Sequence, residues 1–330
     1  MNEINNTILE VNNLKTYFYT EEGVIPAVDG LDFTLNFGET LAIVGESGCG
    51  KSVTALSILN TIQSPPGKII DGEINYRGKN LLAYDEKEMQ KIRGNEISMI
   101  FQEPLTSLNP VFSIGFQINE AFQIHRNLNK KEARVRSIEM LKSVGIPSPE
   151  KVIDDYPYQL SGGMRQRVMI AMALACNPSI LIADEPTTAL DVTIQAQILN
   201  LLKNLKEDFS TSIILITHDL GIVAHTAQQI IVMYAGQAVE YGAVRQIFHQ
   251  PLHPYTEGLL NSIPIVGENR DRLYNIKGNI PSPKDYSSGC RFAPRCQYAF
   301  DDCFTTAVDL FDEGDSRLVR CLKYRNDGDK

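Results

Sequence analysis

Residues 45–52 read Gly-Glu-Ser-Gly-Cys-Gly-Lys-Ser and match the pattern G-x-x-x-x-G-K-[ST] at every fixed position. The apolar run 41–44 precedes them, and residues 52–62 (SVTALSILNTI) have the apolar spacing of a helix. A loop between a strand and a helix N-terminus binds phosphate well, because glycine backbone N–H groups and the helix dipole face the anion. We therefore interpret this stretch as a phosphate-binding loop rather than a chance glycine-rich turn. Lys51 would reach the β- and γ-phosphates, and the Ser52 hydroxyl would hold Mg²⁺.

Composition limits the class of protein. The chain has 330 residues, enough for one large domain plus an extension, and its 43% apolar content supports a substantial core. A net charge of −9 argues against a nucleic-acid partner. No apolar run approaches the ~18 to 20 residues that span a bilayer, and residues 1–10 lack the features of a secretory signal. We expect the chain to be cytosolic or held at a membrane by other subunits, with its cysteines as thiols or metal ligands rather than disulfides.

Residues 8–44 alternate short strand candidates, beginning with 8–11 and 14–19, with turns, which predicts an antiparallel sheet ahead of the loop. Further along, strand candidates alternate with helix candidates, and this order indicates a mostly parallel sheet with helices on both faces. Residues 179–184 form an apolar strand that ends on Asp184 and is followed by Glu185. Carboxylates at the carboxyl edge of such a strand are placed for Mg²⁺ and for an attacking water. The strand 212–217 ends beside His218 in the same way.

The order of several motifs along residues 8–260 or so resembles that in the ATP-binding subunits of ABC transporters. A phosphate loop alone is shared by many enzyme classes, but an LSGG signature about 110 residues later makes the resemblance specific. One departure is Met164 after LSGG, where most of the superfamily has Gln. The matching motifs after the loop are Gln102, Leu160-Ser161-Gly162-Gly163, Asp184-Glu185, Ala189-Leu190-Asp191 and His218.

The resemblance implies an α/β fold of the P-loop NTPase (ABC ATPase) type. Its parts would be a RecA-like core, an N-terminal antiparallel β-subdomain, a helical signature subdomain and a C-terminal extension. Residues 1–245 would form the nucleotide-binding domain, with the helical subdomain at about 104–165. Residues 246–330 would form the extension, which carries four cysteines.

The resemblance also assigns ATP and Mg²⁺ to particular residues. The Phe18 ring would stack on adenine, although the cluster 17–19 is also compatible with ordinary strand packing. Ser52 and Gln102 would ligate Mg²⁺, with Asp184 acting through water. The residues that would surround the nucleotide phosphates are Gly45, Glu46, Ser47, Gly48, Cys49, Gly50, Lys51, Ser52 and Val53.

The remaining roles concern hydrolysis. Glu185 would polarise the attacking water, and His218 would contact the γ-phosphate. Taken singly, Glu185 could be a capping acid and His218 a core histidine; the ordered set favours the catalytic roles. Ser161, Gly162 and Gly163 would complete the site of the opposite subunit, because such ATPases work as head-to-tail dimers. The loop 103–113 would face the membrane subunits or would be a plain surface turn.

A further segment narrows the subfamily. Residues 250–256 (QPLHPYT) resemble the "HPY" segment of oligopeptide and dipeptide transporter ATPases, and Met164 resembles the first of their two paired ATPases. The expected function is ATP-driven uptake of di- or oligopeptides at the cytoplasmic face of the cell membrane. Expected partners are two permease subunits, a homologous second ATPase and, indirectly, an extracytoplasmic peptide-binding protein, with no nucleic acid. Nickel, metallophore or glutathione cargo remains an alternative, and so does a non-transport relative in DNA repair or translation.

Four of the six cysteines gather at the end of the chain, after a Pro/Gly/Ser-rich linker at 264–289. Four thiolates at short spacing suggest a tetrahedral Cys₄ site, although the spacing is not the C-x-x-C of ordinary zinc sites. Some peptide-transporter ATPases carry a 4Fe–4S cluster on cysteines of this kind, so we expect that cluster, with Zn²⁺ or bare thiols as alternatives. Its ligands would be Cys290, Cys296, Cys303 and Cys321. Cys49 and Cys176 are expected to be a small filler and a core residue.

Overall fold

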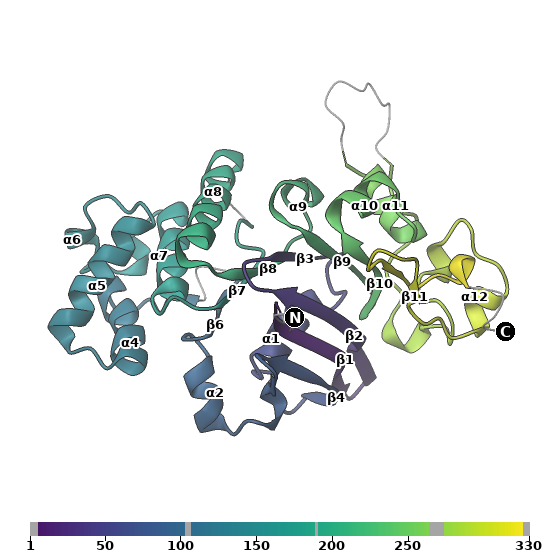
Figure 1. Cartoon of the computed structure of the whole chain (residues 1–330), viewed down its shortest axis with the longest axis horizontal. Coiled ribbons are helices and arrows are strands. Elements are labelled where there is room, and N and C mark those ends of the chain that lie inside the picture. Colours follow the sequence, from purple (N-terminus) through teal and green to yellow (C-terminus); the bar gives the residue numbers. More distant parts are fainter. Residues whose placement is uncertain (1–5, 103–106, 189–190, 264–273, 326–330) are drawn as a thin grey trace, which may run out of the picture. The chain divides into compact units, whose positions relative to one another are not determined.

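The computed structural model describes residues 6–102, 107–188, 191–263 and 274–325 (Figure 1). It divides into two compact units. The first contains Met1–Leu35, Thr40–Leu82 and Ile216–Lys330, and the second contains Asn36–Glu39 and Ala83–Leu215. The phosphate-loop stretch and the cysteine-rich extension therefore belong to the same unit.

An antiparallel sheet forms the N-terminal part of the first unit, as predicted. Its order is β2 (Gly23–Asn36), β1 (Thr7–Thr20), β4 (Gly67–Tyr76) and β5 (Lys79–Asn80). Two separate strand predictions in residues 8–19 merge into the single strand β1, whose pairing with β4 shifts between Asn12 and Lys15. A short 3-10 helix, η1 (Leu81–Ala83), follows.

A second set of strands in the first unit has the order β11 (Phe311–Asp312), β12 (Leu318–Val319), β10 (Gln237–Ala243), β9 (Gln229–Tyr234) and β3 (Thr40–Val44). The β3 and β9 strands are parallel, and β12 pairs antiparallel with β10. The extension therefore continues the sheet that carries the phosphate loop. The helices of this unit are α1 (Lys51–Ile58), α9 (Leu220–Thr226), α10 (Val244–His249), α11 (Pro254–Asn261) and α12 (Asp302–Thr305).

One apolar core joins the strands to the extension. Buried rings of Tyr234, Tyr255 and Phe292 pack together, with centroids 4.8 to 5.4 Å apart. Ile276, from the segment after α11, belongs to the same core. Burial of such rings is a main source of folding free energy, so the extension is an integral layer of this unit. Its short 3-10 helices are η3 (Pro283–Asp285), η4 (Ala293–Arg295) and η5 (Leu322–Tyr324).

The second unit is mostly helical (Figure 1). Its strands have the order β8 (Ser212–Ile216), β7 (Ile180–Asp184) and β6 (Ile97–Ile100), and β6 and β7 are parallel. The sequences of these three strands are mostly apolar because both faces of this part of the sheet are covered. The helical elements are α2 (Glu86–Ile92), α4 (Ile114–Arg126), α5 (Lys130–Ser143), α6 (Pro149–Val152), η2 (Pro157–Gln159), α7 (Gly162–Leu174) and α8 (Val192–Phe209).

Side-chain caps explain where several of these helices begin. Ser113 accepts a hydrogen bond from the Phe116 N–H at the start of α4. Asn129 and Glu132 form a capping box on α5. Each cap satisfies backbone donors that the first turn leaves unpaired.

Of the predicted ATPase motifs, Ala189 and Leu190 lie outside the described residues, as do 103–106 of the predicted membrane-facing loop. None of the described helices has both the length and the apolarity needed to cross a bilayer.

Candidate functional site

The phosphate-loop stretch joins β3 to α1, as the sequence predicted. All five residues of β3 are buried, and α1 begins at Lys51. Gly45 and Gly50 have φ values of 154° and 104°. A Cβ at Gly45 would lie 2.2 Å from the Met233 carbonyl oxygen, and one at Gly50 would lie 2.1 Å from that of Ala27. The two glycines are therefore required, because the loop passes against neighbouring backbone where no side chain fits.

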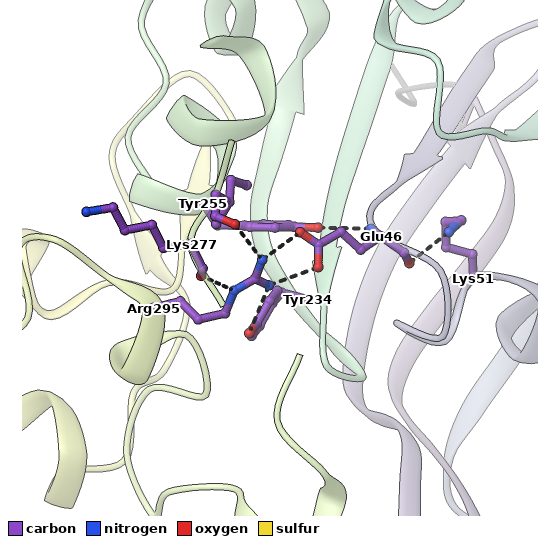
Figure 2. Close-up of polar contacts among 7 residues, drawn as sticks. Glu46, Lys51, Tyr234, Tyr255, Lys277 and Arg295 are labelled. Atoms are coloured by element: carbon purple, nitrogen blue, oxygen red, sulfur yellow. Dashed lines mark hydrogen bonds and ion pairs between the residues drawn. The ribbon is translucent and has the colours of Figure 1, made fainter. Parts of the chain in front are cut away.

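Lys51 turns its side chain back across the loop (Figure 2). Its Nζ donates to the carbonyl oxygens of Gly45 (2.8 Å) and Glu46 (3.1 Å) and lies 3.9 Å from the Cys49 sulfur. Burial raises the pKa of the Cys49 thiol, which therefore stays neutral, in agreement with its predicted role as a filler. The loop thus holds one ammonium group beside a helix N-terminus, and both attract phosphate oxygens.

The other residues of the loop differ in how far they are exposed to solvent. Ser47 and Gly48 are exposed, whereas Ser52 and Val53 are half-buried in the first turn of α1. N–H groups of a first helical turn have no partner within the helix, so they can donate to an anion. Glu46 is bound by another side chain of the protein. Its carboxylate accepts hydrogen bonds from Arg295 at 2.9 and 3.1 Å (Figure 2).

In the second unit, the structure brings Gln102 and Glu185 together. The Gln102 Nε2 donates to Glu185 Oε2 at 3.1 Å, and the Thr188 hydroxyl donates to the same oxygen at 2.8 Å. Glu185 has a positive φ of 45°, and Asp184 before it is buried at the end of β7. Positive φ is uncommon for a residue with a side chain and often marks functional positions. Two hydrogen-bond donors therefore orient the carboxylate that the sequence assigned to the attacking water.

The signature residues open α7. The Ser161 side chain accepts a hydrogen bond from the Met164 N–H at 3.4 Å, and Ser161 and Gly162 are exposed. Gly163 packs closely, since a Cβ there would lie 3.2 Å from the Ile194 side chain. This arrangement leaves the start of a thirteen-residue helix facing solvent, where an anion is favoured. Met164 takes part only through its backbone in this cap, so its departure from Gln leaves the cap intact.

Phe18 and His218 lie in the first unit. Phe18 is half-buried opposite Gly67 in the β1–β4 pairing. Alternation along β1 places it on the same face as Thr16, whose hydroxyl is 2.8 Å from that of Ser57 in α1. The Tyr17 hydroxyl, on the other face, donates to Asp29 at 2.6 Å. His218 is exposed between β8 and α9, so it is not a core histidine.

The predicted residues divide between the units. The phosphate loop, Phe18 and His218 lie in the first unit, and Gln102, Asp184, Glu185 and Ser161–Gly163 lie in the second. The sequence reading missed Arg295 and Tyr255, which contact Glu46 (Figure 2). The available signal was a pair of arginines in the cysteine-bounded stretch 290–296 (CRFAPRC), where only the cysteines drew attention.

The four C-terminal cysteines line one small cavity of about 20 Å³, together with His253 and Phe292. Burial raises the pKa of the Cys290 thiol to about 11, and burial also raises the pKa values of Cys296 and Cys321. Backbone N–H groups two residues further on favour each of these three thiolates. As the side chains stand, no group of three or more His, Cys, Asp or Glu residues in the described chain is positioned to hold a metal ion.

Comparisons with known proteins identify the class. The family described as "ABC transporter" matches residues 28–188, and "Oligopeptide/dipeptide transporter, C-terminal region" matches residues 239–303. A solved structure titled as the ATP-binding cassette MJ0796 bound to ADP and Pi has a TM-score of 0.64 and 30% identity, covering 72% of this chain and 99% of that one. The fold and the site thus define an ABC-type ATPase. This chain belongs to the ABC transporter ATP-binding proteins, in their oligopeptide/dipeptide branch, and is a transport-coupled ATPase.

Similarity to curated relatives extends over the full chain. The oligopeptide transport ATP-binding protein AppD of Bacillus subtilis (strain 168) is 58% identical over 322 residues, which cover 98% of each chain. A probable peptide ABC transporter ATP-binding protein, y4tR of Sinorhizobium fredii, is 53% identical over 297 residues, covering 90% of this chain and 89% of the relative. The predicted family and fold are therefore confirmed, and these relatives are transport proteins rather than DNA-repair or translation factors.

Proposed function

We propose that this chain hydrolyses ATP to power the import of di- and oligopeptides through a membrane permease. The observation that carries the proposal is the 58% identity to AppD across 98% of both chains, because it includes the C-terminal region as well as the ATPase core. Growth or uptake assays with a panel of labelled cargoes test it. A strain lacking the gene should lose uptake of peptides of two or more residues. Loss of nickel, metallophore or glutathione uptake with intact peptide uptake would replace the peptide assignment.

The phosphates and the adenine of ATP are assigned to residues of the first unit. Backbone N–H groups among residues 47–53 and the Lys51 ammonium would hold the phosphates, and the Phe18 ring would stack on adenine. The Ser52 hydroxyl, with Gln102 and Asp184, would hold Mg²⁺, an oxygen-ligand set of the kind this ion prefers. Mg²⁺ supplies positive charge that offsets the negative charge developing on the transferred phosphoryl group.

Hydrolysis is assigned to Glu185. Its carboxylate, oriented by Gln102 and Thr188, would accept a proton as water attacks the γ-phosphate. The exposed His218 imidazole would donate a hydrogen bond to the γ-phosphate. Both roles depend on positioning and charge rather than on covalent chemistry, which is typical of phosphoryl transfer.

Assembly follows from the same assignment. Two permease subunits, a homologous second ATPase and, indirectly, an extracytoplasmic peptide-binding protein would be the partners, with this chain peripheral on the cytoplasmic face of the cell membrane. Ser161, Gly162 and Gly163 would cover the nucleotide of the paired ATPase. Co-purification of tagged chain from membranes tests this: two permease subunits and a second ATPase should be retained. Recovery of a homodimer of this chain would refute the heterodimer.

A 4Fe–4S cluster, or alternatively Zn²⁺, is proposed for the C-terminal cysteines. The support is that four thiols line one cavity and that backbone N–H groups favour three of the thiolates. Bound there, the group would act structurally, tying segments of the extension together. Anaerobic purification with iron, sulfide and zinc analysis and a visible spectrum tests it. About four irons per chain with a broad band near ~400 nm would support the cluster, stoichiometric zinc would support the alternative, and neither metal would refute both.

A further inference from the structure

The phosphate loop contains an acid at its second position. Glu46 carries a carboxylate in a loop whose proposed ligand is polyanionic, and like charges a few ångströms apart repel strongly where solvent is limited. In the structure this carboxylate is paired with both terminal nitrogens of Arg295, at 2.9 and 3.1 Å (Figure 2). The two-point pairing neutralises the acid and fixes the direction of its side chain.

Arg295 is itself held in place from several sides. Its Nε donates to the Lys277 carbonyl oxygen at 3.0 Å, and its Nη1 donates to the Tyr234 hydroxyl at 3.4 Å. The guanidinium also lies over the rings of Tyr234 and Phe292. Only 6% of the Arg295 side chain is exposed, compared with 29% of Glu46. The arginine is therefore the fixed partner, and the loop acid is the group that it holds.

The backbone of Glu46 is also held at both ends. Its N–H donates to the hydroxyl of the buried Tyr255 at 2.9 Å, and its carbonyl oxygen accepts from Lys51 (Figure 2). Tyr255 belongs to the HPY segment at the start of α11. The extension thus reaches the phosphate loop twice, once through the Arg295 guanidinium and once through the Tyr255 hydroxyl.

Besides its contact with the phosphate loop through Arg295, the cysteine-bounded stretch 290–296 also contacts the N-terminal sheet. Arg291, directly after Cys290, pairs with Asp29, which also accepts the Tyr17 hydroxyl. Arg291 further donates to the Ala235 carbonyl oxygen at 2.6 Å. The stretch 290–296 therefore places one arginine near each of its two cysteines, and both arginines bind acids of the N-terminal region.

We propose that Arg295 is a positioning residue for ATP binding, which neutralises Glu46 and holds the phosphate loop open to the nucleotide phosphates. This rests on the assignment of residues 45–52 as the phosphate loop. The cysteine-bounded stretch thereby becomes part of the nucleotide site's support. Loss of the guanidinium leaves an unpaired carboxylate beside the phosphates, so the defect is electrostatic and is relieved by removing that charge.

The test is a charge-rescue cycle on the full chain assembled with its transporter partners. ATP affinity and the KM and kcat of ATP hydrolysis are measured for Arg295→Ala, Glu46→Gln and the double variant. Arg295→Ala should weaken ATP affinity and raise KM about tenfold with little change in kcat, because one partly solvated charge near a polyanion changes affinity by about one factor of ten. The double variant should return to within about threefold of wild type. A merely structural arginine would show no such rescue.

Two controls separate the possible failures. Arg134→Ala removes another two-point arginine–carboxylate pair, with Asp154 in the second unit, and should leave ATP affinity unchanged. Lys51→Ala should abolish ATP binding. Two outcomes overturn the positioning role, provided that Lys51→Ala still fails to bind ATP. One is wild-type ATP affinity in folded Arg295→Ala, and the other is a loss of affinity that Glu46→Gln does not relieve. Normal binding by Lys51→Ala would instead overturn the phosphate-loop assignment. If Arg295→Ala does not fold, Arg295→Lys, which keeps one charge but loses the two-point pairing, gives the same readout with a smaller shift.

Discussion

Replacement of Glu185 by Gln separates ATP binding from hydrolysis. The substitution keeps the shape of the side chain and one acceptor oxygen but removes the ability to take up a proton. General-base catalysis contributes roughly 10²- to 10⁴-fold, or about 3 to 5 kcal/mol of barrier. We therefore expect kcat to fall by at least about 10²-fold.

The contacts of Glu185 indicate what the substitution spares. Its Oε2 accepts from both Gln102 and Thr188, at 3.1 and 2.8 Å. A glutamine oxygen can still accept both bonds, whereas its amide group replaces the second oxygen with a donor. The expected cost in stability is on the order of one neutral hydrogen bond, about 1 kcal/mol. ATP affinity should stay within about threefold of wild type, because no phosphate contact is assigned to this side chain.

The assay is single-turnover ATP hydrolysis beside equilibrium ATP binding, on the chain assembled with its transporter partners. Thr188→Ala is the matched control, since it removes one orienting donor but keeps the carboxylate; it should lose activity by less than Glu185→Gln. Wild-type turnover by Glu185→Gln would refute the role assigned to Glu185. Equal loss of ATP affinity and turnover would instead make this acid a structural group.

The other predictions concern binding, stability and pH. Lys51→Ala should lose ATP affinity itself in equilibrium binding, and unchanged affinity would contradict its assignment. Arg317→Ala should lower the free energy of unfolding by about 3 kcal/mol in denaturant titration, since the fully buried Glu240 carboxylate loses the guanidinium that binds it at 2.8 Å and keeps the uncharged N–H donors of Leu252 and His253. The exposed Arg136→Ala should cost under about 1 kcal/mol. Burial lowers the pKa of His253 to about 3. Below about pH 6.5 this histidine is therefore protonated in the unfolded chain but stays neutral in the folded chain. Stability should therefore fall by about 2 kcal/mol between pH 7 and 5, a loss that His253→Asn should lack; an identical pH profile in that variant would refute the assignment.

The sequence alone determined the class of this protein, because its motifs are local. A phosphate loop needs glycines, a lysine and a hydroxyl at set spacing, and each of these residues acts through backbone or side-chain geometry within a few residues. The strand before the loop, the helix after it and the antiparallel sheet ahead of it followed from apolar periodicity in the same way. Cys176 was also read correctly as a core residue, since it is buried.

The lengths of the strands and the partners of the side chains could not be predicted from the sequence. Two predicted strands in residues 8–19 form one continuous strand, because pairing with β4 spans the turn-like residues between them. Glu46 looked like one more phosphate-loop residue, and its pairing with Arg295 joins positions 249 residues apart. No local pattern signals such a contact.

Only tertiary structure made the C-terminal extension part of the ATPase core. Its strands β11 and β12 pair onto the sheet that carries β3, and Phe292 packs against Tyr234 and Tyr255. By sequence this segment was a separate tail with four cysteines after a linker. Hydrogen-bond pairing at a sheet edge and ring packing depend on three-dimensional proximity, which periodicity and spacing do not encode. The motifs thus defined the chemistry, and long-range packing decided which residues support it.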